Sequence, residues 1–76
     1  MPLKLSNLPL HTQGIIVGFD EDDIVLKLME MGFIPGEKVS IEHVSPAGDP
    51  IVITVSGYLV SLRLNEASKI LVEVAN

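Results

Sequence analysis

Few residues of this 76-residue chain have side chains suited to catalysis or metal binding. Its two histidines, His11 and His43, lie far apart, and neither belongs to a His-x-Asp/Glu pattern of the kind that binds metal. The absence of Cys excludes disulfides and thiolate chemistry. We therefore expect no dedicated metal site, with His11 in a solvated loop and His43 at a strand end. Alternatively, His43 is a half-buried ring that hydrogen bonds to the backbone.

The acidic run Asp20-Glu21-Asp22-Asp23 is the strongest local concentration of charge. It lacks the glycine and the final glutamate of a calcium-binding loop. Carboxylates stabilise the first turn of a helix, and Asp20 is a suitable N-cap. Together with Gly32, a typical residue at a helix end, the run predicts a helix near residues 21–31.

Motifs of catalysis are missing from the sequence. It contains no Gly-x-Ser-x-Gly, no phosphate-binding Walker loop and no His-Glu-x-x-His. Asp49, which precedes Pro50, is expected to be a turn residue. A single domain over residues 1–76 is also too small to enclose a large substrate pocket. We expect no enzymatic activity and no cofactor.

Charge and hydropathy restrict the partners and the compartment. The formal net charge is −5, whereas a nucleic-acid-binding surface normally requires clustered Lys and Arg. The longest apolar runs are far shorter than the roughly 20 residues that cross a bilayer. Residues 1–10 lack the apolar core of a secretory signal. The sequence predicts a cytoplasmic protein that does not bind nucleic acid.

Alternating apolar residues predict the elements that must position any site. The first strand is expected over 14–19, with Ile15, Val17 and Phe19 on one side. Four more strands are expected over 38–43, 51–56, 58–63 and 70–74, separated by turns at Pro35-Gly36 and Pro46-Ala47-Gly48 and by a bulge or corner at Gly57. Leu3, Leu5 and Leu8 are expected to pack as a lead-in, and Asn65 to cap one helical turn. The predicted fold is mainly β, a small, partly open barrel of about five strands with one helix.

The predicted helix and its exit carry more apolar side chains than one packed face needs. Ile24, Leu28 and Met31 share one stripe and should face the barrel. Leu26 and Met29 lie elsewhere on the helical wheel. Either the whole set belongs to the core, as is common in small domains, or part of it faces outward toward a partner.

In this order and spacing, several segments resemble the FeoA family. They are Leu28-Met29-Glu30-Met31-Gly32-Phe33-Ile34-Pro35-Gly36, Ser45-Pro46-Ala47-Gly48-Asp49-Pro50-Ile51, Gly57-Tyr58, Leu62-Arg63 and Glu66-Ala67. The resemblance implies an SH3-like barrel. It also implies a cytosolic accessory protein of ferrous iron uptake that docks on the cytosolic GTPase region of the membrane transporter FeoB. The chain departs from the family pattern at Leu64, where a basic residue is common, and at His11, near a frequent glycine.

Within this resemblance, the surface near the helix exit is the expected partner-binding region. Its candidate residues are Leu26, Met29, Phe33, Tyr58 and Arg63. Arg63 could equally pair with Glu66 or Glu73.

Two other classes of function are open, and self-association is a further possibility. A small-barrel nucleic-acid binder would need a basic, aromatic face. A direct iron chaperone would need His11, His43 and the acidic run to converge.

Overall fold

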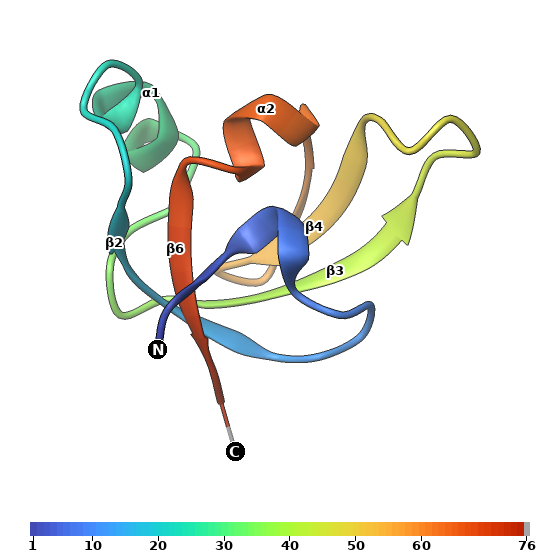
Figure 1. Ribbon diagram of the computed structural model, residues 1–76, viewed down its shortest axis with the longest axis horizontal. Helices are drawn as coiled ribbons and strands as arrows, with labels where there is room; N and C mark the ends of the chain where they lie inside the picture. The colour runs from blue at the N-terminus through green and yellow to red at the C-terminus, as the bar shows by residue number, and fades with distance from the viewer. Residues whose placement is uncertain (76) are drawn as a thin grey trace.

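The computed structural model describes residues 1–75 and contains one antiparallel sheet of six strands with three short helical segments (Figure 1). The sheet order is β1-β6-β2-β3-β4-β5. The elements are β1 (Leu3–Lys4), the 3₁₀ segment η1 (Leu5–Asn7), β2 (Gly14–Phe19), α1 (Val25–Glu30), β3 (Lys38–Val44), β4 (Ile51–Val55), β5 (Tyr58–Leu62), α2 (Leu64–Ala67) and β6 (Ile70–Val74).

The sheet curves around one core but does not close, because β1 and β5 remain at its two edges. This architecture confirms the mainly β, loosely barrel-like fold. The sixth strand was not predicted: β1 pairs with β6 through Leu3 and Val72. The expected lead-in does pack, because Leu5 and Leu8 are buried.

The core consists of apolar side chains from every part of the chain. Its buried members are Leu5, Leu8, Ile16, Leu28, Phe33, Val39, Ile41, Ile51, Ile53, Val55, Leu62, Ala67, Ile70 and Val72. No helix in residues 1–75 is long and apolar enough to cross a membrane.

Two β-bulges change the predicted faces of the strands. In β2, the pairing with β6 shifts between Ile16 and Gly18, so Ile16 is buried and Val17 is exposed. The expectation that Ile15, Val17 and Phe19 share one side of the strand is therefore wrong. In β3, the shift lies between Ile41 and His43, and the His43 side chain is exposed. The half-buried alternative for His43 is also wrong, because the extra residue reverses the alternation.

Helix α1 is shorter than predicted and starts four residues later. The backbone N–H of Asp20 donates to the Lys69 carbonyl (2.8 Å), which keeps Asp20 beside the chain that leads into β6. Ile24 occupies the N-cap position, and no acidic residue lies in the first turn. The predicted capping by Asp20 is therefore wrong, whereas the helix ends as expected at Gly32, whose φ is 103°.

The turn over residues 34–37 matches its prediction. The Glu37 N–H donates to the Ile34 carbonyl (3.0 Å), and Gly36 has a φ of 97°, which a type II turn requires at this position. This turn leads directly into β3.

Helix α2 differs from the prediction in its capping. Arg63 is its N-cap residue, and Asn65 lies inside the helix. The predicted capping by Asn65 is therefore wrong.

Candidate partner-binding surface

The outward side of α1 carries exposed apolar side chains. Leu28 is fully buried, and Ile24 and Met31 pack against the core, as the predicted stripe requires. Leu26 lies on the opposite side and is 72% exposed, and Met29 is 38% exposed. The helix therefore exposes apolar side chains that do not pack in the core, because the opposite side of the helix already makes the core contacts.

Phe33 does not belong to this surface. Its side chain is fully buried, and its backbone N–H donates to the Leu28 carbonyl (3.0 Å) at the end of α1. The positive φ of Gly32 turns the chain back toward the sheet, which directs the ring inward. Phe33 is a core residue, and its buried side chain cannot make the expected contact with a partner.

Tyr58 and Arg63 lie at the two ends of edge strand β5. Tyr58 is 74% exposed, and the Arg63 side chain is also exposed. The hydroxyl of Ser56 lies 3.5 Å from the Gly32 carbonyl, so the turn before Tyr58 lies beside the end of α1. Four of the five predicted residues thus lie on the surface, two on α1 and two around β5.

An ion pair joins α1 to α2. Lys27 Nζ lies 2.7 Å from Glu66 Oε2, and the Arg63 backbone N–H donates to Glu66 Oε1 (3.0 Å). Glu66 thus pairs through its side chain with Lys27 and only with the backbone of Arg63. The hydrogen bond from Lys27, followed by that from Arg63, lowers the pKa of Glu66 from its ordinary value. This carboxylate links α1 to α2 at the surface.

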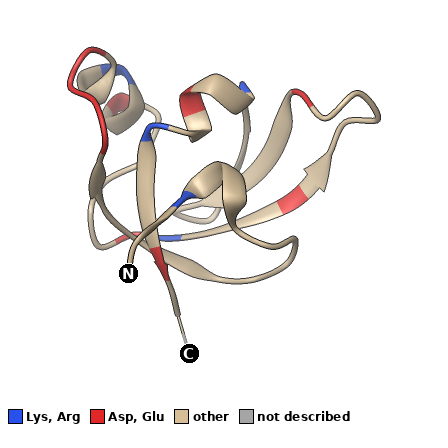
Figure 2. Ribbon diagram, viewed as in Figure 1, with Lys and Arg blue, Asp and Glu red and all other residues tan. Residues whose placement is uncertain are grey.

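The acidic run forms the loop between β2 and α1 (Figure 2). Lys69, whose side chain is largely buried, places its ammonium group 3.2 Å from Asp23 Oδ2 and 4.0 Å from Glu21 Oε2. The run therefore anchors the loop to the start of β6 instead of capping a helix. It also surrounds the start of α1 with negative charge.

Asp49 has a role that its sequence position did not reveal. Its Oδ1 accepts a hydrogen bond from the backbone N–H of Leu64 (2.9 Å), the first residue of α2. The contact joins the loop between β3 and β4 to the start of α2. The family segment around Asp49 is the only signal in the sequence that could have pointed to it.

Glu42 organises a small polar cluster on the outer face of the sheet. Its Oε2 accepts hydrogen bonds from Ser40 (2.6 Å) and Thr54 (2.7 Å), and His11 Nδ1 lies 3.6 Å from its Oε1. The two hydroxyl groups, and then His11, lower the pKa of the carboxyl. His11 has a φ of 60°, a left-handed conformation that suits the glycine frequent near this position of the family.

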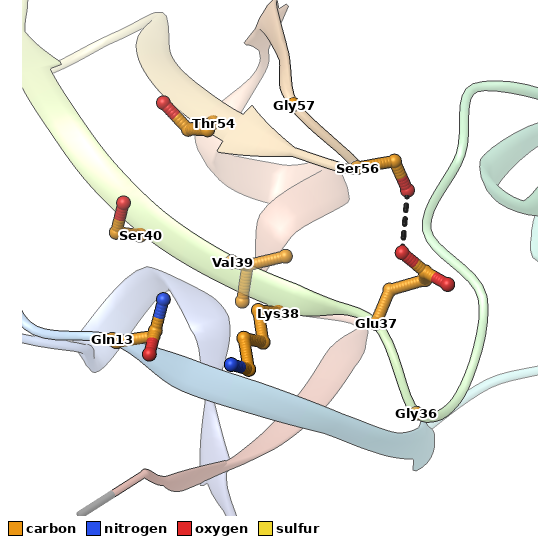
Figure 3. A pocket seen from close by; sticks show the side chains of 9 residues that line it. All are labelled: Gln13, Gly36, Glu37, Lys38, Val39, Ser40, Thr54, Ser56 and Gly57. Carbon is orange, nitrogen blue, oxygen red and sulfur yellow. Dashed lines mark hydrogen bonds between the residues drawn. The ribbon is translucent and has the colours of Figure 1, made fainter.

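A shallow groove of about 440 Å³ lies over β3 and β4 (Figure 3). Most of the residues that line it are of polar type, among them Gln13, Lys38, Ser40 and Thr54. In Figure 3 the Glu37 carboxylate points toward Ser56, whose hydroxyl donates to it (2.8 Å). Across residues 1–75, no three His, Asp or Glu side chains lie close enough together to hold a metal ion.

The curved, open sheet around one small core defines a small SH3-like domain. Residues 3–74 match the model of the FeoA domain, and the chain therefore belongs to the FeoA family. The fold and the family inferred from the sequence are both confirmed.

One curated relative joins two proteins in one chain. Over 73 residues, 95% of this chain, the sequence is 34% identical to the Fe(2+) transport protein A/Fe(2+) transporter FeoB fusion protein of Porphyromonas gingivalis. The match covers 9% of that relative's length.

Two solved structures share the fold. The NMR structure of an FeoA-like protein from Clostridium acetobutylicum has a TM-score of 0.91 at 34% identity, and the match covers 99% of this chain and 88% of that one. The crystal structure of Stenotrophomonas maltophilia FeoA in complex with zinc has a TM-score of 0.79 at 33% identity, with 96% and 89% covered. That protein is described as a procaryotic SH3 domain protein.

Proposed function

We propose that this chain is a non-enzymatic accessory protein of ferrous iron uptake that docks on the cytosolic GTPase region of a FeoB-type membrane transporter. The observation that carries the proposal is the relative from Porphyromonas gingivalis, in which an FeoA segment and a FeoB transporter form one polypeptide. A covalent fusion keeps both parts at a high effective concentration, an arrangement that suits partners that act together.

The outward side of α1 is the surface we assign to this contact. Leu26 and Met29 are three residues apart on the helix, so their side chains are neighbours on one face. Removing such apolar surface from water favours association, and a flexible Met side chain adapts to the shape of a partner. Tyr58, an exposed residue that follows the turn beside the helix end, is a further candidate for the same contact.

The charges around α1 specify the kind of partner surface that fits. The acidic loop 20–23 precedes the two apolar residues and Glu30 follows them, while Lys27 between them pairs with Glu66 and Lys69 pairs with Asp23 and Glu21. A complementary partner would present an apolar patch with Lys or Arg at its rim. Docking of this kind would place the protein on the cytosolic side of the membrane, beside the transporter.

Recovery of the transporter from membranes tests the proposal. The immobilised chain should retain the FeoB-type transporter from detergent-solubilised membranes, and retention should change with added guanine nucleotide if the GTPase region is the docking site. Met29→Glu should reduce retention, whereas Val17→Glu, which changes a similarly exposed residue on β2 (42%), should not. Equal retention by all three chains would exclude α1 as the docking surface.

A further inference from the structure

Strand β5 has one free edge. It is the last strand of the sheet and pairs only with β4, from Val55 and Tyr58 to Ile51 and Leu62. Ser56 and Gly57, the two residues of the turn between these strands, have φ values of 51° and 82°, as in a type I′ hairpin. In such a hairpin the residues that flank the turn form backbone hydrogen bonds to each other. The backbone N–H and C=O groups of every second residue of β5, beginning with Tyr58, therefore point toward β4.

Leu59 and Ser61 therefore direct their backbone N–H and C=O groups away from the sheet. No other backbone hydrogen bond reaches β5 within residues 1–75. Leu59 is also 71% exposed, although it lies in the middle of a regular strand. The edge thus combines unpaired backbone groups with exposed apolar surface.

This edge lacks the features that normally prevent pairing with another chain. Exposed edge strands usually carry a Lys, a Pro or a bulge. β5 (Tyr58–Leu62) has none of these, and no charged residue occurs between Pro50 and Leu62. In a chain with a net charge of −5, two copies would repel each other least along this stretch.

We propose that two copies of this chain associate edge to edge through antiparallel pairing of β5 with β5. The unpaired backbone groups set the register: Leu59 of one copy pairs with Ser61 of the other. Val60 of one copy then lies opposite Val60 of the other, on the two-fold axis. This arrangement forms four new backbone hydrogen bonds and places Tyr58 opposite Leu62 of the second copy. The two sheets become one continuous sheet of twelve strands. The proposal does not rest on docking to a transporter, although Tyr58 is a candidate residue for both contacts.

In this register Arg63, which follows β5, lies near the Glu37 carboxylate of the second copy, which contacts the turn before β5. Arg63, which is exposed and forms no salt bridge among residues 1–75, lies opposite Gly57 of the second copy. Gly57 adjoins the hydrogen bond between Ser56 and the Glu37 carboxylate, at the end of the groove (Figure 3). In that view the Lys38 ammonium group points away from Glu37, toward β2. Each copy can therefore offer a carboxylate to the other copy's guanidinium group.

Sedimentation equilibrium of the purified chain over a range of concentrations tests the proposal. The wild type should change from the mass of one chain, 8.2 kDa, toward twice that mass as its concentration rises. Ser61→Pro removes an outward-facing N–H without removing a bond to β4, and Leu59→Lys adds a charge to the edge. Both variants should remain monomeric at concentrations where the wild type is mostly dimeric, with thermal melts to confirm folding.

Controls matched in exposure and charge make the result specific. Leu26→Lys changes a residue of equal exposure on α1 and should keep the dimer. Arg63→Glu should weaken the dimer at least several-fold, and adding Glu37→Arg in the same chain should restore part of the loss. A wild type that stays monomeric at millimolar concentration would overturn the proposal, as would a dimer that survives both Leu59→Lys and Ser61→Pro.

Discussion

At the scale of single residues, Asp49 stabilises the first turn of α2 through its side chain. Its carboxylate accepts a hydrogen bond from the Leu64 N–H. The first N–H groups of a helix have no acceptor within the helix itself, and this is one of them. Asp49→Ala should therefore destabilise the protein by about 1 kcal/mol, the typical cost of losing a side-chain cap. Urea denaturation measures the change. Asp22→Ala, which removes an exposed carboxylate without a side-chain hydrogen bond in residues 1–75, should be close to neutral, and equal losses in both variants would refute the capping role.

The ion pair between Glu66 and Lys27 makes the stability of the fold depend on pH. Because the folded-state pKa of this carboxyl is lowered, its contribution is complete above the unfolded-state pKa of about 4.3 and is lost as the pH falls through the lowered value. Glu66→Gln should cost roughly 0.5–1 kcal/mol at neutral pH and less in acid. Thermal melts from pH 7 down to about pH 3 measure this difference. Parallel curves for wild type and variant would contradict it, and Glu30→Gln is the exposed control.

The acidic residues show why sequence reasoning failed at this scale. Asp20 has the position expected of an N-cap, but its backbone bonds to Lys69, and the helix starts later. Asp49 lies in the turn region between β3 and β4, as expected, but its carboxylate also accepts the backbone N–H of the first residue of α2. Both outcomes depend on contacts between segments that are distant in sequence, which local patterns do not contain. Turn geometry at Gly36, in contrast, is local and was predicted correctly.

At the scale of elements, the turn before β3 depends on backbone conformation alone. Gly36 has a φ of 97°, and a Cβ added there would meet no atom within 4 Å. Gly36→Ala should therefore cost about 1–2 kcal/mol through conformational strain. Gly18→Ala also meets nothing within 4 Å but involves no positive φ, so its effect should be neutral or slightly stabilising. Denaturation midpoints compare the two variants, and equal effects would show that the strain is relieved by the loop.

The two sides of α1 should respond differently to substitution. Leu26→Glu and Met29→Glu change outward side chains and should alter the free energy of unfolding by less than about 0.5 kcal/mol. Leu28→Ala empties a fully buried position and should cost about 2–5 kcal/mol. Thermal melts of the three variants measure these effects. A large loss for Leu26→Glu would mean that this side chain is needed for folding, and the docking surface would have to be sought around Tyr58.

The positions of the strands were more predictable than the irregularities within them. Every predicted strand exists, because period-2 alternation follows directly from packing one face of a sheet. The bulges near Val17 and Glu42 were missed, since one inserted residue reverses the alternation without a characteristic residue type. Strand β1 was missed because two residues are too few to show a period.

At the scale of the whole molecule, the barrel-like fold and the family could be predicted from the sequence, and the site only in part. Leu26, Met29, Tyr58 and Arg63 are on the surface, whereas Phe33 completes the core. The helical wheel separated Leu26 from Leu28 because both lie within one regular helix. It could not place Phe33, which follows the helix end and is directed by the turn at Gly32.

Binding of the purified chain to the purified cytosolic region of a FeoB-type transporter tests the central claim most directly. Isothermal titration calorimetry should show saturable binding by the wild type. Leu26→Glu should weaken the affinity roughly thirtyfold, equivalent to about 2 kcal/mol for a charge placed in an interface core, without lowering the melting temperature. Val17→Glu should bind like the wild type. Absence of binding by the wild type, or undiminished binding by a folded Leu26→Glu variant, would contradict the account.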